Sequence, residues 1–140
     1  MSSPYCTLCS GKYEGNLLVT TTHELSGSTL LTDAPVDNQG RGSSFSPTDL
    51  VGVALGTCIL TTMGIIAKRD EIDIDGSKFS VEKMMSDNQP RKITMLKVNF
   101  NLPISIPSDY RKKLEGCTHA CPVHRALHPD IKIDFSFSYE

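Results

Sequence analysis

The feature that most constrains the fold is an uncharged, largely apolar segment between Asp49 and Lys68. The residues before it, Ser46-Pro47-Thr48-Asp49, are typical of a helix start. Serine suits the N-cap, proline suits the first turn, and the aspartate lies where a capping box forms and where the helix dipole favours a negative charge. We therefore predict a helix from Pro47 to about Lys68. Glycines and threonines interrupt the segment, and it is slightly short for a bilayer, so we interpret it as a core helix and not a membrane span.

A helix that is apolar nearly all round must be buried on most of its sides. The chain has 140 residues, which fits one domain with a core of its own. We expect an N-terminal tail over residues 1–10 and a single domain over residues 11–140. A chain of this size can hardly enclose the apolar helix completely, so we expect a partner subunit to help cover it.

Strand patterns lie on both sides of this helix. They cover residues 11–32, 78–85, 93–100 and 131–139, where β-prone or alternating residues recur. A short helix is predicted over residues 108–115 with Ser108 as its cap, and a second one begins near Pro122. The order of strands, long helix, strands, short helices and strand predicts an α+β fold.

The charges argue against two classes of partner. The net charge is −2, and the 14 lysines and arginines are scattered, which argues against a nucleic-acid surface. The densest basic group, Arg111-Lys112-Lys113, reads as a solvated helix face. The N-terminus lacks a basic stretch followed by an apolar run, so we expect no signal peptide and a cytoplasmic protein.

Five cysteines in a chain that shows no secretion signal point to a reducing compartment. Their odd number excludes a disulfide framework in which every cysteine of the chain is paired. Cys58 lies well inside the predicted helix, among apolar neighbours. In that position it can be an inert core residue, because free cysteine packs like a small hydrophobe. A reactive role would need a cation, since the helix N-terminus is too far away to stabilise a thiolate. Arg41, in the loop before the helix, is the nearest candidate in sequence.

The other four cysteines, Cys6, Cys9, Cys117 and Cys121, allow different interpretations. Together they can be written as a four-ligand zinc site, although only the Cys6-x-x-Cys9 half has the usual spacing. Cys6 and Cys9 can also form a redox pair, or be spare thiols in a tail. The pattern alone leaves these alternatives open.

Two motifs together resemble the OsmC/Ohr family of osmotically inducible and organic hydroperoxide resistance proteins. Residues 46–50 followed by residues 54–58, Ala-Leu-Gly-Thr-Cys, resemble the central-helix motif, and Cys121-Pro122-Val123 resembles the second cysteine motif. The resemblance implies an intertwined homodimer and a thiol peroxidase without a cofactor. Cys58 would attack an organic hydroperoxide, Cys121 would resolve the product as a disulfide, and a thiol or dithiol would reduce that disulfide.

The chain departs from the family pattern in the residues that activate the cysteine. Thr48 stands where well-studied members carry a glutamate that orients an arginine. Asp49 is the candidate replacement, and Arg41 is the candidate arginine. Cys117 is an additional thiol that can compete with Cys121. Two alternatives to the peroxidase therefore remain: a zinc-binding or redox-sensing module, and an OsmC-fold binder of a small apolar ligand without peroxidase activity.

Overall fold

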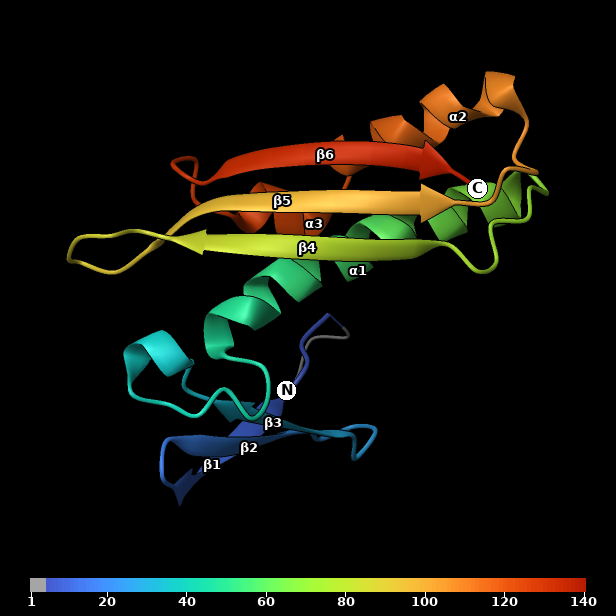
Figure 1. The fold of residues 1–140 in the computed structure, drawn as a ribbon. Coiled ribbons are helices and arrows are strands. Elements are labelled where there is room, and N and C mark those ends of the chain that lie inside the picture. Colours follow the sequence, from blue (N-terminus) through green and yellow to red (C-terminus); the bar gives the residue numbers. More distant parts are fainter. Residues whose placement is uncertain (1–4) are drawn as a thin grey trace. The chain divides into compact units, whose positions relative to one another are not determined.

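The structure is a computed structural model that describes residues 5–140. These residues form two compact units, one ending at Leu50 and the other running from Val51 to Glu140. Each unit contains one three-stranded sheet (Figure 1). The first strand begins at Cys9, inside the segment expected as a tail, and residues 1–4 of that segment lie outside the described residues. A single domain over residues 11–140 stays a prediction.

The first unit is an antiparallel sheet with strands in the order β1 (Cys9–Gly15), β2 (Leu18–His23) and β3 (Thr29–Asp33). A long loop follows, and Asp33 closes it, because the backbone N–H and the hydroxyl of Ser43 both donate to Asp33 Oδ2, at 3.0 and 2.6 Å. The Ser43 hydrogen bonds hold the pKa of the Asp33 carboxyl below its ordinary value, so this buried group stays ionised. The loop that carries Arg41 is thus tied to the end of β3.

The turn between β1 and β2 carries backbone strain. Gly15 pairs with Leu18, which leaves a two-residue loop, and both of its residues have positive φ, 54° at Asn16 and 66° at Leu17. Two-residue hairpins favour this geometry, but they favour glycine at the second position, and a bulky side chain there is disfavoured by steric contact with its own backbone.

We expect Leu17→Gly to stabilise the chain by about 0.5–1 kcal/mol, because relief of the αL strain exceeds the entropy cost of a glycine. The free energy of unfolding in urea measures this. Leu17→Ala is the control, since it shortens the side chain and keeps most of the strain. Equal stabilities of the two variants would contradict a backbone origin.

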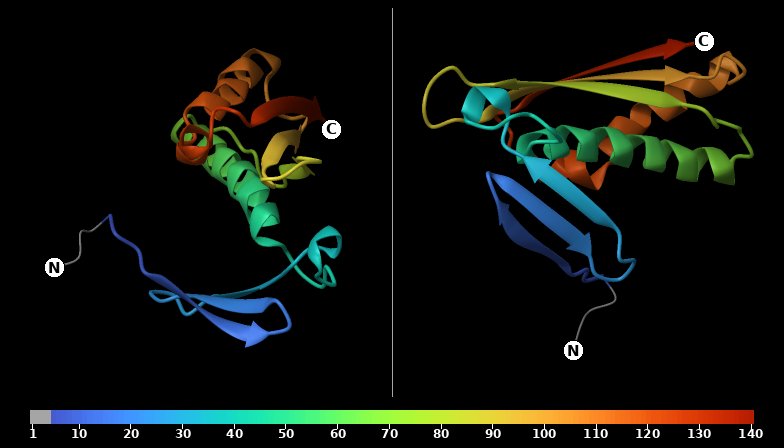
Figure 2. Two further views of the ribbon diagram at one scale, coloured as in Figure 1. Left: turned by 90° about the vertical axis from the view of Figure 1, so that its left-hand side faces the viewer. Right: turned by 60° about the horizontal axis from the view of Figure 1, so that its bottom comes forward.

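The second unit consists of a sheet covered by helices. Its elements are α1 (Pro47–Arg69, of which the first residues belong to the first unit), β4 (Lys78–Met85), β5 (Ile93–Leu102), α2 (Ser108–Glu115), a 3₁₀ turn (Gly116–His119), α3 (Pro122–Ala126) and β6 (Lys132–Tyr139). The strand order is β4-β5-β6, with β4 antiparallel and β6 parallel to β5. The three helices lie on the same face of this sheet (Figure 2). The predicted α+β order, the long helix and the strands that follow it are confirmed.

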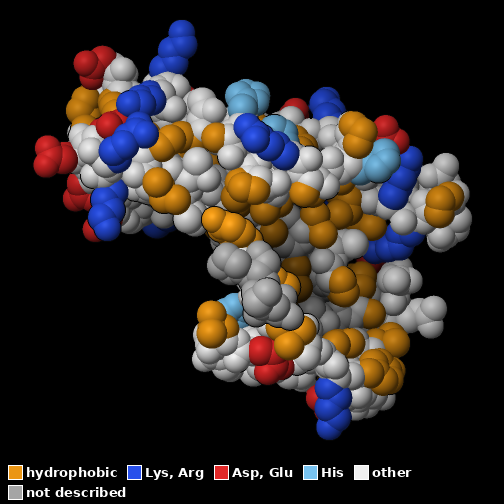
Figure 3. Space-filling model, turned by 180° about the vertical axis from the view of Figure 1, so that it is seen from behind, with side chains coloured by type: hydrophobic (Ala, Val, Ile, Leu, Met, Phe, Trp, Pro, Cys, Tyr) orange, Lys and Arg blue, Asp and Glu red, His pale blue; other side chains and the backbone are white. Residues whose placement is uncertain are grey.

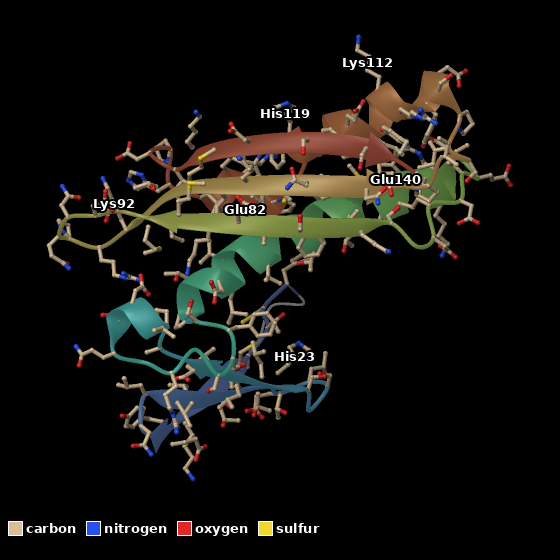
Figure 4. The ribbon with its side chains drawn as sticks, viewed as in Figure 1. His23, Glu82, Lys92, Lys112, His119 and Glu140 are labelled. Atoms are coloured by element: carbon tan, nitrogen blue, oxygen red, sulfur yellow. The ribbon has the colours of Figure 1, made fainter. Side chains whose placement is uncertain are left out.

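The alternation of β5 explains which face is buried. Leu96, Val98, Phe100 and Leu102 are buried under the helices, and the aromatic residues of β6 pack beside them. On the other face most residues are polar, the Met84–Met95 pair excepted, because successive side chains of a strand point to opposite sides. Glu82 of β4, Lys97 of β5 and Asp134 of β6 lie opposite one another in register, so charges alternate across the three strands. Figure 4 shows Glu82 on this helix-free face.

Helix α1 buries one stripe of side chains against the sheet. Its buried residues follow helical spacing: Gly52, Leu55, Gly56, Ile59, Met63 and Ala67. Gly56 is required here, since a Cβ atom at this position would lie 2.3 Å from the ring of Phe79. Within the described residues α1 is the one helix long and apolar enough to cross a membrane, but its packing on the sheet makes it a core helix, as we expected from the sequence.

The opposite side of α1 stays accessible in the single chain. Thr57, Thr61 and Ile65 lie four residues apart along this side, and Ile65 is 66% exposed. One copy of the chain thus leaves this side of the helix uncovered, in line with the expectation that a chain of this size can hardly enclose it. Hydrophobic side chains are visible at the surface of the second unit when it is viewed from the helix side (Figure 3).

Two details of α2 differ from the sequence-based expectation. Ser108 is the first residue of the helix and not its cap; Pro107 holds the cap position. The basic group is also less solvated than expected, because Arg111 donates to the carbonyl oxygens of Ile104 and Ile106 and stacks 4.1 Å from the centre of the Tyr139 ring. Arginine has a planar group with several donors, so it can make both contacts at once.

Asp70, which follows α1, ties that helix to α2. Its Oδ2 atom accepts hydrogen bonds from Lys113 Nζ and from the Tyr110 hydroxyl, both at 2.7 Å. Both hydrogen bonds lower the pKa of Asp70, and the bond from Lys113 has the larger effect. Burial, together with the bond to Asp70, raises the pKa of Tyr110 to about 12. The carboxylate is thus bound in its charged form.

A group whose pKa is lowered by folding contributes stability above its unfolded pKa, near 3.9, and loses that contribution as the pH falls below it. We therefore expect Asp70→Asn to lower the free energy of unfolding at neutral pH, and the difference from wild type to shrink below about pH 4. Urea unfolding across this range measures the effect. Asp87→Asn, in an exposed turn, is the control and should stay within about 0.5 kcal/mol of wild type. If the difference in unfolding free energy between Asp70→Asn and wild type did not change with pH, the lowered pKa of Asp70 would be contradicted.

Candidate active site

Cys58 lies on α1, about 16 Å from the start of the helix at a rise of 1.5 Å per residue. It is half-buried, and it packs against the core between the fully buried Leu55 and Ile59. The site around the thiol is therefore apolar, and the positive end of the helix is too distant to stabilise a thiolate directly.

Cys121 is the N-cap of α3 and is 0% exposed. Pro122 follows it at the first helical position, where its missing N–H is not needed. The backbone N–H of His124 donates to Cys121 Sγ at 3.3 Å, so the thiol takes the place of the usual oxygen in an N-cap. This hydrogen bond fixes the direction of the Cys121 side chain.

The fold brings the thiols of Cys58 and Cys121 together. Their side chains are close enough to interact, although they come from distant parts of the chain. Burial is the main reason why the pKa of Cys121 is raised, and the interaction with Cys58 raises it further, while the N–H of His124 opposes both. At neutral pH Cys121 therefore remains a thiol beside Cys58.

Cys117 has a different environment. It is buried in the 3₁₀ turn, where its Sγ lies 3.7 Å from the carbonyl oxygen of Lys113. Burial raises its pKa, and the charge of Lys113 partly offsets this. The two cysteines near the C-terminus are thus distinguished by their neighbours, since it is Cys121 that interacts with Cys58.

His124 is a site residue that the sequence reasoning missed. Its ring Nδ1 lies 2.8 Å from the carbonyl oxygen of Thr118, and because a carbonyl can only accept, this nitrogen carries the proton. The ring also packs edge-on against Phe135, with centroids 5.7 Å apart. The available signal was its spacing, since the third residue after an N-cap supplies the N–H that the cap accepts.

Arg41 and Asp49 belong to the first unit. Arg41 is exposed in the loop and lines an open surface hollow with Asn16, Leu17, Gln39 and Gly40. Asp49 forms the capping box expected from the sequence: Ser46 N–H donates to Asp49 Oδ2 at 2.8 Å, and Asp49 N–H donates to Ser46 Oγ at 3.1 Å. Asp49 thus has a structural task at the start of α1. The action of either residue on Cys58 stays a prediction.

Cys6 and Cys9 are exposed at the start of the described chain, where Cys9 opens β1. Over residues 5–140, no three side chains of histidine, cysteine, aspartate or glutamate gather into a group that could hold a metal ion. The four-cysteine zinc site therefore gains no support from the structure.

Comparison with known proteins identifies the family. The model of the OsmC-like protein family matches residues 40–136, so the chain belongs to that family, as the two cysteine motifs led us to expect. No curated protein sequence matches the chain.

Solved structures agree with this assignment. A protein from Psychrobacter arcticus, provisionally described as an osmotic stress induced and detoxification response protein, is 34% identical, with a TM-score of 0.88 over 98% of this chain and 99% of its own. An organic hydroperoxide resistance protein from Elizabethkingia anophelis is 12% identical, with a TM-score of 0.77 and complete coverage of both chains. A further one from Legionella pneumophila is 18% identical, with a TM-score of 0.75 over 98% of this chain and 99% of its own. At 12% and 18% identity, the likeness to the last two proteins shows only that this chain has the same fold.

Proposed function

We propose that the protein is a cytoplasmic thiol peroxidase that reduces organic hydroperoxides with Cys58 and Cys121. The observation that carries the proposal is the approach of these two thiols to each other inside an apolar site. Membership of the OsmC-like family supports a redox role in stress defence. All five cysteines are free thiols, in keeping with a reducing compartment.

The first step would use Cys58 as the nucleophile. The Cys58 thiolate attacks the terminal oxygen of the hydroperoxide, the O–O bond breaks, and the alkoxide leaves as the alcohol after taking up a proton. Cys58 becomes a sulfenic acid. Leu55 and Ile59 beside the thiol would solvate an alkyl group better than water, which favours organic hydroperoxides over hydrogen peroxide.

In the second step the Cys121 thiol would attack the sulfur of the sulfenic acid. An S–S bond forms between Cys121 and Cys58, and the hydroxyl group leaves as water with the thiol proton. The N–H of His124 holds the attacking sulfur at the N-cap. A thiol or dithiol then reduces the disulfide by exchange. We retain Arg41 as the candidate cation for Cys58, and Asp49 as its candidate partner.

We also propose that the active form is a homodimer. Every hydrophobic side chain that is buried in the described chain belongs to the second unit. The first unit leaves Leu31, Val36 and Phe45 exposed by 40% or more. A lone three-stranded sheet needs another layer to bury its apolar face, and so does the accessible side of α1. A second copy of the chain would supply both.

Disulfide mapping tests the proposed chemistry. We expect one equivalent of cumene hydroperoxide to be consumed in wild type and a Cys58–Cys121 disulfide to be the first to form, as seen at short times by intact mass and non-reducing peptide mapping. Cys58→Ser is the control and should leave the peroxide intact. A free Cys58 thiol in wild type with peroxide remaining would refute the peroxidase and favour a ligand-binding role.

A further inference from the structure

The proposed reaction leaves one pair of thiols unused. Cys6 and Cys9 are both exposed, and they stand three positions apart at the edge of the first sheet. Cys6 precedes β1, so its backbone is outside the β1–β2 ladder, while Cys9 is the first residue within it. The spacing is that of dithiols that exchange with disulfides.

A histidine lies beside this pair. Cys9 pairs with His23 across β1 and β2, so the two side chains project from the same face of the sheet at neighbouring positions. His23 Nδ1 lies 2.6 Å from the hydroxyl of Ser26, which orients the imidazole at the end of β2 (Figure 4). The Cys9 thiol therefore lies beside an oriented imidazole on an exposed strand at the edge of the sheet.

The proposed Cys58–Cys121 disulfide would be poorly accessible. Cys121 is 0% exposed, and Cys58 is only partly exposed on α1. Exchange requires a thiolate to approach one of the two sulfurs along the S–S axis. A large dithiol protein would meet steric obstruction there, whereas it could reach Cys6 and Cys9 directly.

We propose, on the basis of the proposed peroxidase function, that Cys6 and Cys9 form an internal dithiol that reduces the Cys58–Cys121 disulfide, within one chain or between two copies. The thiolate of one cysteine of the pair attacks the disulfide, which releases one buried thiolate and leaves a mixed disulfide. The other cysteine then attacks the mixed disulfide and releases the second buried thiol. Two electrons pass from Cys6 and Cys9 to the buried pair, Cys6 and Cys9 end as a disulfide, and the protons they lose are taken up by Cys58 and Cys121.

Closure of the Cys6–Cys9 disulfide sets a geometric condition. The two Cα atoms must approach to within about 7 Å, whereas an extended chain separates residues three apart by roughly 10 Å. The segment between them must therefore fold into a turn. That turn would break the backbone hydrogen bond from Glu24 N–H to the Leu8 carbonyl oxygen, while the ladder from Cys9 onward can stay intact.

Peroxide stoichiometry tests the relay. Fully reduced protein, freed of small thiols, is mixed with a small excess of cumene hydroperoxide, and the peroxide consumed per chain is measured. We expect two equivalents for wild type and one for Cys6→Ser/Cys9→Ser, with peptide mapping locating a Cys6–Cys9 disulfide in wild type. Cys117→Ser, the matched control at a cysteine outside the relay, should still consume two. Cys58→Ser should consume none.

The possible failures are distinguishable. One equivalent in both wild type and the double variant, with Cys58 and Cys121 joined in each, would overturn the relay and leave the peroxidase intact. A Cys6–Cys9 disulfide formed in Cys58→Ser would also overturn it, because the pair would then react with peroxide directly. No consumption in wild type would overturn the peroxidase and the relay with it.

Discussion

Replacing Cys58 with serine is expected to lower the rate of peroxide reduction on the order of 10³-fold or more, because no S–O bond can form without this sulfur. The measurement is consumption of cumene hydroperoxide in the presence of dithiothreitol. A serine hydroxyl is only slightly smaller than the thiol, so the packing around Leu55 and Ile59 should survive. An unchanged melting temperature would show that the loss is chemical.

Cys121→Ser separates the two steps of the reaction. The first equivalent of peroxide should still be consumed, since Cys58 is intact, but the product should stay a sulfenic acid that a dimedone probe traps. Cys117→Ser is the matched control, because Cys117 is also buried near the C-terminus and its sulfur contacts Lys113. It should form the Cys58–Cys121 disulfide as wild type does. If Cys117→Ser instead accumulated the sulfenic acid and Cys121→Ser formed a disulfide, Cys117 would be the resolving cysteine.

Gly56→Ala is expected to destabilise the protein by about 1–3 kcal/mol, because the added methyl group must displace the Phe79 ring in the core. A Cβ atom at residue 56 would lie 2.3 Å from two ring carbons of Phe79 and 3.0 Å from a third. The ring is rigid, so it can yield only by moving as a whole or by shifting α1 away from β4.

Gly64→Ala is the matched control on the same helix. A Cβ atom there meets nothing within 4 Å in the single chain, and alanine is favoured over glycine in a helix by about 1 kcal/mol. Urea unfolding at one fixed subunit concentration should therefore rank Gly64→Ala well above Gly56→Ala. Similar stabilities of the two variants would show that α1 does not pack on β4 as the structure has it.

Local signals predicted most of the elements. The start of α1 was predictable because Ser46 and Asp49 make a capping box from residues three positions apart. The strand at the C-terminus was predictable because its alternation reports one buried face. The cap of α2 was harder to predict. Pro107 and Ser108 are both compatible with a helix start, and residue propensity does not tell which of two adjacent residues is the cap.

The role of charged side chains was harder to predict. Arg111 and Lys113 looked like part of a solvated face, but their partners, Tyr139 and Asp70, come from distant segments. Helical spacing shows which side chains share a face, and it does not show what other elements lie against that face. His124 is a different case, because its contact with Cys121 is local and follows from the spacing of an N-cap and its third residue.

For the candidate site, the sequence by itself determined which residue types are present and on which elements they stand: Cys58 on an apolar helix, and Cys121 before a proline that starts another. The resemblance to the OsmC/Ohr family paired them. Only the tertiary structure decided that Cys121, with its thiol held by His124, is the C-terminal cysteine that lies beside Cys58. The physical reason is that helix and strand signals depend on neighbours along the chain, whereas contact between thiols depends on how α1 and α3 pack on the same sheet.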